Sequence, residues 1–389
     1  MSDFAADRAS DGEAEAIPAG RRRGERAVGD RAVGERTAGE RAAGERAVGE
    51  REAGEREAEE LARRFERERP YMRRIAYGTL GSFAEADDVV QEAWLRLQRV
   101  DADAIDDLRA WLTTVVGRLA LDALGSARVR RERYVGPWLP EPSVRAAQGA
   151  ATAAEGAAAA ALERGDAVVG GSAASQVDAA DPAERVALDE EVTTALLVVL
   201  ERLSPAERTA FVLHDVFGLG FPEVAEVVGR SPAAVRQLAA RARRHVRDGT
   251  PRFPATREQQ AEIVVAFAAA WQAGDVDTLV GVLDPDVVLT SDGGGVVSAA
   301  RRPIVGSGRV AKALVGFARL GMARRAHARG AIADVNGLPG LLLEGDGVMN
   351  VFSFTVDAGR IVAIDIVRNP QKLRHIATDG LVPMAAEER

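Results

Sequence analysis

The stretch from Ser231 to Arg247 contains five arginines and no acidic residue. Two of its side chains have the chemistry of base recognition, because Arg236 can donate two hydrogen bonds to guanine and Gln237 can bind the edge of adenine. The other arginines suit phosphate oxygens, which carry no base identity. We expect this stretch to bind DNA through Ser231, Ala233, Ala234, Arg236, Gln237, Arg241, Arg243 and Arg244.

The helix that must carry these side chains has clear start signals. Ser231 is a favourable N-cap and Pro232 fits the first helical turn. Just before it, Phe221 and Pro222 open a short helix that stops at Gly229. Helix, tight turn and helix in this order predict a helix-turn-helix, whose second helix enters the major groove of DNA.

A further helix should precede this pair. Ser204 is a natural N-cap, Pro205 fits the first turn, and Glu207 stands where a capping box needs it. A basic surface helix in a small bundle is the alternative reading of residues 231–247. The turn spacing and the absence of acids favour DNA binding over that alternative.

Charge is divided along the segment from Leu61 to Tyr134. Eight acids and two arginines lie between Glu85 and Asp107, whereas five arginines and two acids lie between Arg118 and Arg133. By charge alone, the acidic part is either a solvated face or a protein-binding face, while the basic part suits phosphates. A helix should begin after Asp106 or Asp107 and end near Gly125.

Two runs in this segment, DDVVQEAWLRL from Asp87 and RAWLTTVVGRLALDALGSARVRRERY from Arg109, resemble the conserved helical domain of extracytoplasmic-function sigma factors. Residues 203–246 resemble the −35-recognition domain of the same family. In that family the acidic helix binds the clamp coiled coil of core RNA polymerase, and the arginine-rich helix meets the −10 promoter element.

The resemblance implies roles for individual residues. Besides the clamp, it implies the polymerase flap as a contact. It assigns polymerase binding to Asp87, Asp88, Gln91 and Glu92. It places Arg118, Asp122, Arg128, Arg130 and Arg131 near the −10 DNA.

After Pro251 the pattern changes to a mixture of helices and strands. Helices are expected at 258–271, 276–283 and about 308–320, and strands at 287–291, 340–344, 348–356 and 361–367. This order resembles the SnoaL-like cone, a curved sheet wrapped by helices that holds a small-molecule pocket in other proteins. We therefore predict a multi-domain chain: two all-α helical domains, sigma region 2 and the sigma region 4 helix-turn-helix, followed by an α+β SnoaL-like cone.

An enzymatic cone is the alternative. Relatives of this fold include isomerases and hydrolases that use an aspartate as general base, for which Asp286, Asp292 and Asp365 are candidates. His327 and His375 are the only histidines in this part, and no metal-ligand spacing occurs. We predict a non-enzyme without catalytic residue, metal or cofactor. A SnoaL-like isomerase, hydrolase or small-molecule sensor fused to a DNA-binding module stays as the alternative.

Three short motifs occur together in the chain: WLPEP from Trp138, DGGG from Asp292 and NPQKL from Asn369. The trio resembles the sigma subgroup with a fused SnoaL-like extension, which implies that the extension controls sigma activity in cis. We expect the cone to hold WLPEP and to set the distance between the helical domains. The expected regulatory contacts are Trp138, Leu139, Pro140, Asp292, Gly293, Gly294, Gly295, Asn369 and Pro370.

Two stretches lack the pattern of a folded core. From Gly24 to Arg56 a Gly-acid-Arg triplet recurs every five residues, which matches neither helix nor strand and favours disorder. Residues 143–181 are rich in Ala and Gly without an aromatic residue, as in a linker. The expected division is a disordered charge-balanced repeat tail at 1–60, sigma region 2 at 61–135, a linker with WLPEP at 136–181, sigma region 4 at 182–250, the cone at 257–376 and a C-terminal tail at 377–389.

Composition excludes several other classes of protein. The 389 residues include no cysteine, so disulfides and thiolate chemistry are absent. No apolar run approaches the roughly 18 residues of a membrane helix. The net charge of −8 argues against a general nucleic-acid binder and leaves DNA binding to local patches. We expect a cytoplasmic bacterial protein whose partners are core RNA polymerase and promoter DNA, with a small-molecule ligand in the cone left open.

Overall fold

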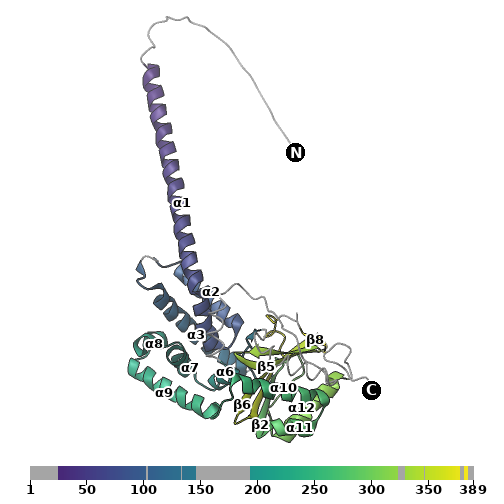
Figure 1. Cartoon of the computed structure of the whole chain (residues 1–389). Helices are drawn as coiled ribbons and strands as arrows, with labels where there is room; N and C mark the ends of the chain where they lie inside the picture. The colour runs from purple at the N-terminus through teal and green to yellow at the C-terminus, as the bar shows by residue number, and fades with distance from the viewer. Residues whose placement is uncertain are drawn as a thin grey trace, which may run out of the picture. The chain divides into compact units, whose positions relative to one another are not determined.

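The computed structural model describes residues 25–101, 104–132, 134–145, 193–322, 329–345, 347–376 and 381–383. The chain divides into two compact units, Met1–Arg64 and Phe65–Arg389. Figure 1 shows the chain, with labels on those helices and strands for which there is room. Across the described ranges, no helix combines the length and the apolar character needed to cross a membrane.

Helix α1 runs from Glu25 to Leu80, so residues 25–60 differ from the predicted disorder. The five-residue repeat places each of its arginines four residues before an acid, as with Arg51 and Glu55. Such i,i+4 pairs contribute about 0.2–0.5 kcal/mol each, which opposes part of the cost of about 1 kcal/mol for each glycine. Arg63 Nη2 lies 3.1 Å from Glu59 Oε2 in this helix. Residues 1–24 lie outside the described ranges.

The first helical domain consists of the end of α1 with α2, Phe83–Leu97, and α3, Leu108–Glu132. Ser82 caps α2, and the Asp107 carboxylate accepts a hydrogen bond from Ala110 N at 3.1 Å, as predicted for the start of α3. Gly125 does not end α3, contrary to the prediction. One glycine costs a helix about 1 kcal/mol, which the helix-favouring residues on both sides offset.

The second helical domain contains α6, Thr194–Leu200, α7, Pro205–Phe211, α8, Phe221–Val228, and α9, Pro232–Gly249. A π-helical turn, Val212–Val216, continues α7. The capping box of Ser204 and Glu207 is confirmed, and Gly229 ends α8 with φ of +67°. Any helical start before Thr193 would fall in 146–192, outside the described residues.

The C-terminal domain is α+β, as predicted. Three helices lie on its sheet: α10, Arg257–Ala273, α11, Val276–Val282, and α12, Ser307–Met322. The sheet contains β1, Val144–Arg145, β2, Leu283–Asp292, β3, Ile304–Val305, β4, Arg329–Val335, β5, Leu338–Gly345, β6, Val348–Asp357, β7, Arg360–Val367, and β8, Val382–Pro383. The strand order is β1-β4-β5-β6-β7-β2-β3, with β8 beside β4. Among the strands that the structure describes, β2 and β7 are parallel and the other pairs are antiparallel.

Two strands of this sheet come from segments that the sequence analysis assigned to linker and tail. β1 lies directly after WLPEP and pairs with β4, Val144 opposite Val335. β8 lies in the predicted tail and pairs with the start of β4, Val382 opposite Gly330. Their two-residue length carries no period from which to predict a strand. β4 itself was not predicted, and its sequence is rich in glycine, alanine and aspartate, which are disfavoured in strands.

Each face of the sheet carries its own apolar core. Towards the helices, Phe267 and Trp271 of α10 pack against Phe352 and Phe354 of β6. On the opposite face, Leu139 of the linker packs with Leu342, Val351 and Leu373, and with half-buried Val198 of α6. The second core therefore joins the C-terminal domain to the linker and to the second helical domain.

Candidate nucleic-acid interface and linker site

The recognition helix α9 has one buried face and one exposed face, because its buried residues recur every three or four positions. Ser231 Oγ accepts a hydrogen bond from Ala234 N, which sets the start of the helix. Val235, Ala239 and Ala242 are buried against the domain. This leaves four predicted base-contacting residues exposed and Ala234 half-buried. The four are Ser231, Ala233, Arg236 and Gln237.

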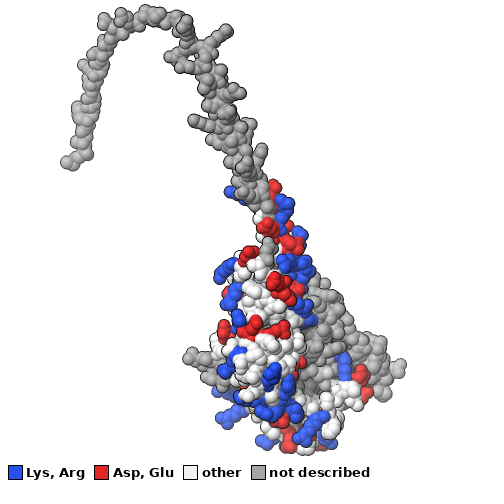
Figure 2. Space-filling model, turned by 90° about the vertical axis from the view of Figure 1, so that its left-hand side faces the viewer, with Lys and Arg blue, Asp and Glu red and all other residues white. Residues whose placement is uncertain are grey.

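The basic side of α9 is oriented by neighbouring acids. Arg243 Nε lies 2.5 Å from the Asp215 carboxylate, and Arg241 reaches within 4.0 Å of Glu207. Arg236 lies over the ring of Phe221, 5.2 Å from its centroid. In Figure 2, basic side chains gather over the lower part of this face, at the height of α9 in Figure 1. The helix thus presents exposed side chains at its start and positive charge along its length, an arrangement that suits DNA binding.

The predicted polymerase-binding residues lie on α2, with different surroundings. Asp88 and Gln91 are exposed. Asp87 forms a bidentate ion pair with Arg73, at 2.7 and 3.0 Å, and Glu92 pairs with Arg96 at 3.1 Å. These pairs are surface contacts and so are readily exchanged for a partner's basic side chains.

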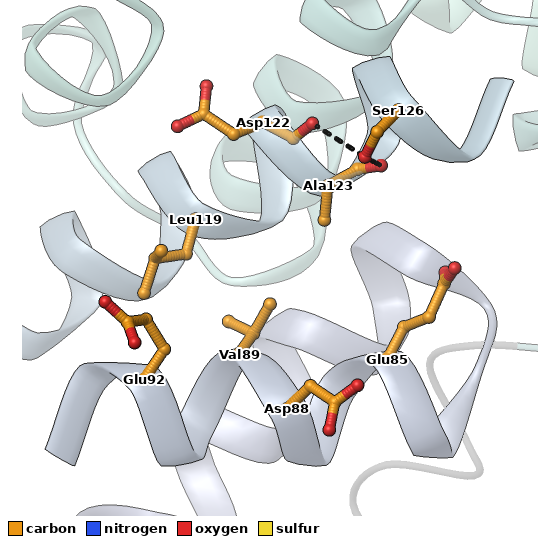
Figure 3. Close-up of a pocket in the computed structure, with 8 residues that line it drawn as sticks. All are labelled: Glu85, Asp88, Val89, Glu92, Leu119, Asp122, Ala123 and Ser126. Atoms are coloured by element: carbon orange, nitrogen blue, oxygen red, sulfur yellow. Dashed lines mark hydrogen bonds between the residues drawn. The ribbon is translucent and has the colours of Figure 1, made fainter. Parts of the chain in front are cut away.

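A groove of about 360 Å³ runs between α2 and α3 (Figure 3). Asp88 and Glu92 line it from α2, and Asp122 and Ser126 line it from α3. The predicted polymerase-binding and −10 residues therefore adjoin one another. Arg118 lies elsewhere, because its guanidinium donates to the carbonyl of Glu226 in α8, at 3.0 and 3.3 Å. The side chains of Arg128, Arg130 and Arg131 lie outside the described part of the chain.

The linker motif meets the DGGG and NPQKL motifs at a buried carboxylate. Asp292 Oδ2 accepts hydrogen bonds from Leu139 N at 2.9 Å and from Lys372 Nζ at 2.8 Å. Its Oδ1 accepts from Tyr134 Oη at 2.6 Å. Asn369 Nδ2 donates to the same hydroxyl at 2.8 Å, and Lys372 also donates to Leu139 O. We call these five residues the Asp292 cluster.

The charged side chains of this cluster are buried. Asp292 is 0% exposed and the Lys372 side chain 7%, so water screens their attraction little. Lys372 Nζ also lies 3.9 Å from the centre of the Trp138 ring. Burial, followed by the hydrogen bond to Asp292, raises the pKa of Tyr134, which keeps its hydroxyl a donor.

The glycines after Asp292 allow close approach. A Cβ on Gly294 would lie 2.3 Å from Asn369 Nδ2, and the φ of +63° also favours glycine. A Cβ on Gly293 would lie 2.3 Å from Val297 O, and one on Gly295 would lie 3.0 Å from Val135. The backbone of the DGGG motif thus comes near Asn369 and the linker.

The other end of WLPEP is bound to the first helical domain. The Glu141 carboxylate accepts from Ser82 Oγ at 2.8 Å and from Phe83 N at 2.6 Å, at the N-terminus of α2. That helix end favours an anion. Pro140 is buried, and Pro142 O accepts from His375 Nε2 at 2.9 Å. Burial lowers the pKa of His375 and so favours its neutral form.

Sequence reasoning missed Asn336, a residue that joins several parts of the chain. Asn336 is 1% exposed and lies in the turn between β4 and β5. Its Nδ2 donates to Tyr77 Oη of α1 at 2.9 Å, while its Oδ1 accepts from Ser143 N and Thr194 Oγ1, each at 3.2 Å. The Asn-Gly pair predicts only a tight turn between strands. Lys372, Glu141 and Tyr134 were likewise missed as site residues, although they lie within or beside the quoted motifs.

The three candidate general bases have separate environments. Asp286 is exposed. Asp292 is occupied by the contacts described above. Asp365 is buried on the sheet face that meets α6, and burial raises its pKa to about 7 despite a hydrogen bond from Thr290 and the nearby charge of Arg202. Pro370, the remaining predicted contact, is exposed beside Asn369.

The fold and the exposed recognition helix define a DNA-binding protein of the helix-turn-helix class. Family models for Sigma-70 region 2 and Sigma-70, region 4 match residues 64–130 and 193–246. The ECF RNA polymerase sigma factor SigJ of Mycobacterium tuberculosis is 40% identical over 319 residues, which cover 79% of this chain and 91% of that relative. The probable ECF sigma factor SigI of the same species is 35% identical over 311 residues, covering 78% and 92%.

A solved structure agrees with these relatives. The crystal structure of M. tuberculosis SigJ superposes with a TM-score of 0.60 at 36% identity, covering 81% of this chain and 98% of that one. The chain therefore belongs to the extracytoplasmic-function sigma factors of the Sigma-70 family. It binds core RNA polymerase and promoter DNA and directs the initiation of transcription.

Proposed function

We propose that the C-terminal domain of this sigma factor controls its activity in cis by limiting how far the two helical domains can separate. The observation that carries the proposal is the double attachment of WLPEP. Leu139 is bonded to the Asp292 cluster in the C-terminal domain, and Glu141 is bonded to the start of α2 in the first helical domain.

The distance between promoter elements supports this role. Elements centred at −10 and −35 are separated by roughly 25 base pairs, or about 85 Å at 3.4 Å per pair. Arg118 of α3, however, lies 3.0 Å from α8 of the helix-turn-helix domain. The two helical domains must therefore separate before one chain can occupy both elements, and every contact that holds them together opposes promoter binding.

The residue assignments belong to the same proposal. Asp87, Asp88, Gln91 and Glu92 would bind the polymerase clamp coiled coil, and the second helical domain would bind the flap. Arg236 and Gln237 would read the −35 bases, supported by their exposure at the start of α9. Asp122 and the arginines of α3 would meet the −10 strand once Arg118 leaves Glu226.

Asp292→Asn tests the regulatory proposal in transcription with core polymerase. The variant keeps the shape of the side chain but leaves Lys372 buried without a counter-charge, which weakens the attachment of WLPEP. We expect promoter output at limiting sigma factor to rise several-fold. The exposed Asp286→Asn is the matched control.

Truncations after Arg252 and, separately, after Ile376 test the same proposal more broadly. Promoter output should differ from that of the full chain in both cases. Unchanged output from Asp292→Asn and from both truncations would contradict control by the C-terminal domain. It would leave the assignment of the chain to the sigma factors standing.

We assign no catalytic role and no ligand to the C-terminal domain. Both Asp292 oxygens accept hydrogen bonds from within the chain, so this carboxylate is not placed to take a substrate proton. Phe267, Trp271, Phe352 and Phe354 occupy the space between the helices and the sheet. Within the described ranges, no cluster of three His, Asp or Glu side chains is placed to hold a metal.

A further inference from the structure

The side chain of Arg236 lies on an aromatic ring of the preceding helix. Arg236 Cζ stands over the ring of Phe221, 5.2 Å from the ring centre. Phe221 is the first residue of α8 and is half-buried, whereas Arg236 is exposed in the first turns of α9. A guanidinium over an aromatic face is attracted by the ring electrons, and this contact uses no N–H hydrogen bond. The donors of Arg236 therefore stay available to a base.

A second ring supports Phe221 from the π-helical turn Val212–Val216. The ring of His214, which lies in this turn, packs on Phe221 with centroids 3.9 Å apart and an angle of 30° between the ring planes. His214 Nδ1 donates a hydrogen bond to Leu219 O at 2.7 Å, since a carbonyl oxygen only accepts. This hydrogen bond fixes the orientation of the imidazole ring. The main chain at Leu219 therefore orients His214, whose ring in turn supports Phe221.

The start of α8 is also fixed. Gly220 N donates to Glu223 Oε2 at 2.6 Å and so closes the first turn of the helix that Phe221 opens. A Cβ on Gly220 would lie 2.9 Å from the same oxygen, which favours glycine at this position. Phe221 is thus held both through its backbone and through its ring.

The π-helical turn reaches the recognition helix at a second point. Asp215, the residue after His214, accepts a hydrogen bond from Arg243 Nε of α9 at 2.5 Å. Turns of this kind interrupt α-helices mostly at functional sites. Here two consecutive residues of one turn orient two arginines of α9, His214 through Phe221 and Asp215 directly.

We propose that Phe221 and His214 are positioning residues for base reading, which hold the guanidinium of Arg236 in place before DNA binds. A free arginine side chain loses much rotamer freedom when it binds a base edge in a fixed geometry. A side chain that is already in place loses less, so its contact with the base is stronger. The inference rests on the proposed reading of a −35 base by Arg236, and it adds the residues that set how sharply this base is read.

Phe221→Leu tests the inference in transcription by core polymerase with the full chain. The promoters carry each of the four bases in turn at every −35 position, and the position that Arg236 reads is the one where Arg236→Ala loses discrimination. Phe221→Leu should lower output from the promoter with the preferred base about two- to fivefold, the effect of one cation–π contact at an exposed site. Promoters with another base at that position should keep their output. A general loss of stability would instead lower all promoters alike.

Three further variants make this result specific. Phe221→Tyr keeps an aromatic ring under the guanidinium and should keep the discrimination of the parent. His214→Leu should lower discrimination at the same base pair as Phe221→Leu, because the ring of Phe221 loses its support. Phe317→Leu is the matched control: Phe317 is 37% exposed on α12, outside the helix-turn-helix domain, and every promoter should keep its output.

A double-mutant cycle connects the effect to Arg236. In the Arg236→Ala background, Phe221→Leu should change discrimination no further, because the guanidinium that it positions is gone. Equal discrimination in Phe221→Leu and the parent overturns the inference alone. So does a loss in Phe221→Leu that persists undiminished in the Arg236→Ala background. Discrimination that Arg236→Ala itself leaves unchanged at every position refutes the proposed base reading and this inference together.

Discussion

At the scale of single residues, the chain places charge where water does not reach. Lys372 and Asp292 form a buried ion pair, and both are also bonded to the backbone of Leu139. Each charge therefore has partners for its remaining hydrogen-bonding capacity. Such a pair adds little when compared with apolar residues, but removing one member leaves the other uncompensated. The pair thus acts mainly to specify where the linker binds.

Lys372→Met should lower the free energy of unfolding by about 3–5 kcal/mol, because Asp292 would remain buried without its counter-charge. Urea denaturation of the full chain measures the change. The chain offers one other lysine, Lys312, which is exposed on α12, so Lys312→Met is the control and should change stability by less than about 0.5 kcal/mol. Equal losses from both variants would refute the role of the buried pair.

Asp365 makes stability depend on pH. Burial raises its folded pKa to about 7, whereas an unfolded aspartate titrates near pH 4. The folded state therefore binds the extra proton, and the free energy of unfolding falls as the pH rises from about 4 to about 7. Each unit of difference between the folded and unfolded pKa of Asp365 changes the free energy of unfolding by about 1.4 kcal/mol.

Asp365→Asn should remove this slope and make the variant more stable than the parent above pH 7. Burial lowers the pKa of His375, whose contribution runs in the opposite direction, so the difference between variant and parent isolates Asp365. Denaturation series at pH 5 and pH 8 measure it. If the difference in free energy of unfolding between variant and parent does not grow from pH 5 to pH 8, the pKa of Asp365 is not raised by burial.

At the scale of elements, the recognition helix combines two kinds of arginine. Arg236 lies in its first turns and Arg244 in its later turns, and both are exposed. Loss of a base contact should cost about 1–3 kcal/mol at one base pair, whereas loss of a phosphate contact weakens all sequences alike.

Arg236→Ala should therefore relax specificity at one −35 position, and Arg244→Ala should weaken every promoter while reducing the salt dependence of binding. Transcription from a set of single-base promoter variants measures both effects, each variant serving as the control for the other. Equal output from wild type and Arg236→Ala on every promoter would disprove the base-reading assignment.

Local signals predict the helices of this chain better than its strands. Ser204, Ser231 and Asp107 act through neighbours one turn away, so each cap could be read from sequence. The long helix α1 was missed because the five-residue repeat was compared with apolar periods and not with i,i+4 charge spacing. The short strands β1 and β8 form only because β4 supplies their partners.

At the scale of the whole molecule, polar side chains connect the three domains, in addition to the apolar core that joins the C-terminal domain to the linker and the second helical domain. Asn336 connects α1, the linker and α6, and its partner Tyr77 lies 259 residues away in sequence. The Asp292 cluster and the contact of Arg118 with Glu226 hold the same arrangement from two other sides. Under the proposed control in cis, several of these contacts would break together before the chain occupies a promoter, and we expect the change between the two states to be cooperative.

The sequence by itself determined the domain order, the recognition helix with its exposed arginines, and the three motifs that meet at the linker. These depend on caps, apolar periods and charge runs, which act over one or two turns of chain. Only the tertiary structure decided that Arg118 caps α8, that Glu141 binds α2, and that Asn336 joins three domains. Such contacts depend on how distant surfaces pack, and a glycine such as Gly117 carries no local sign that Val227 lies against it.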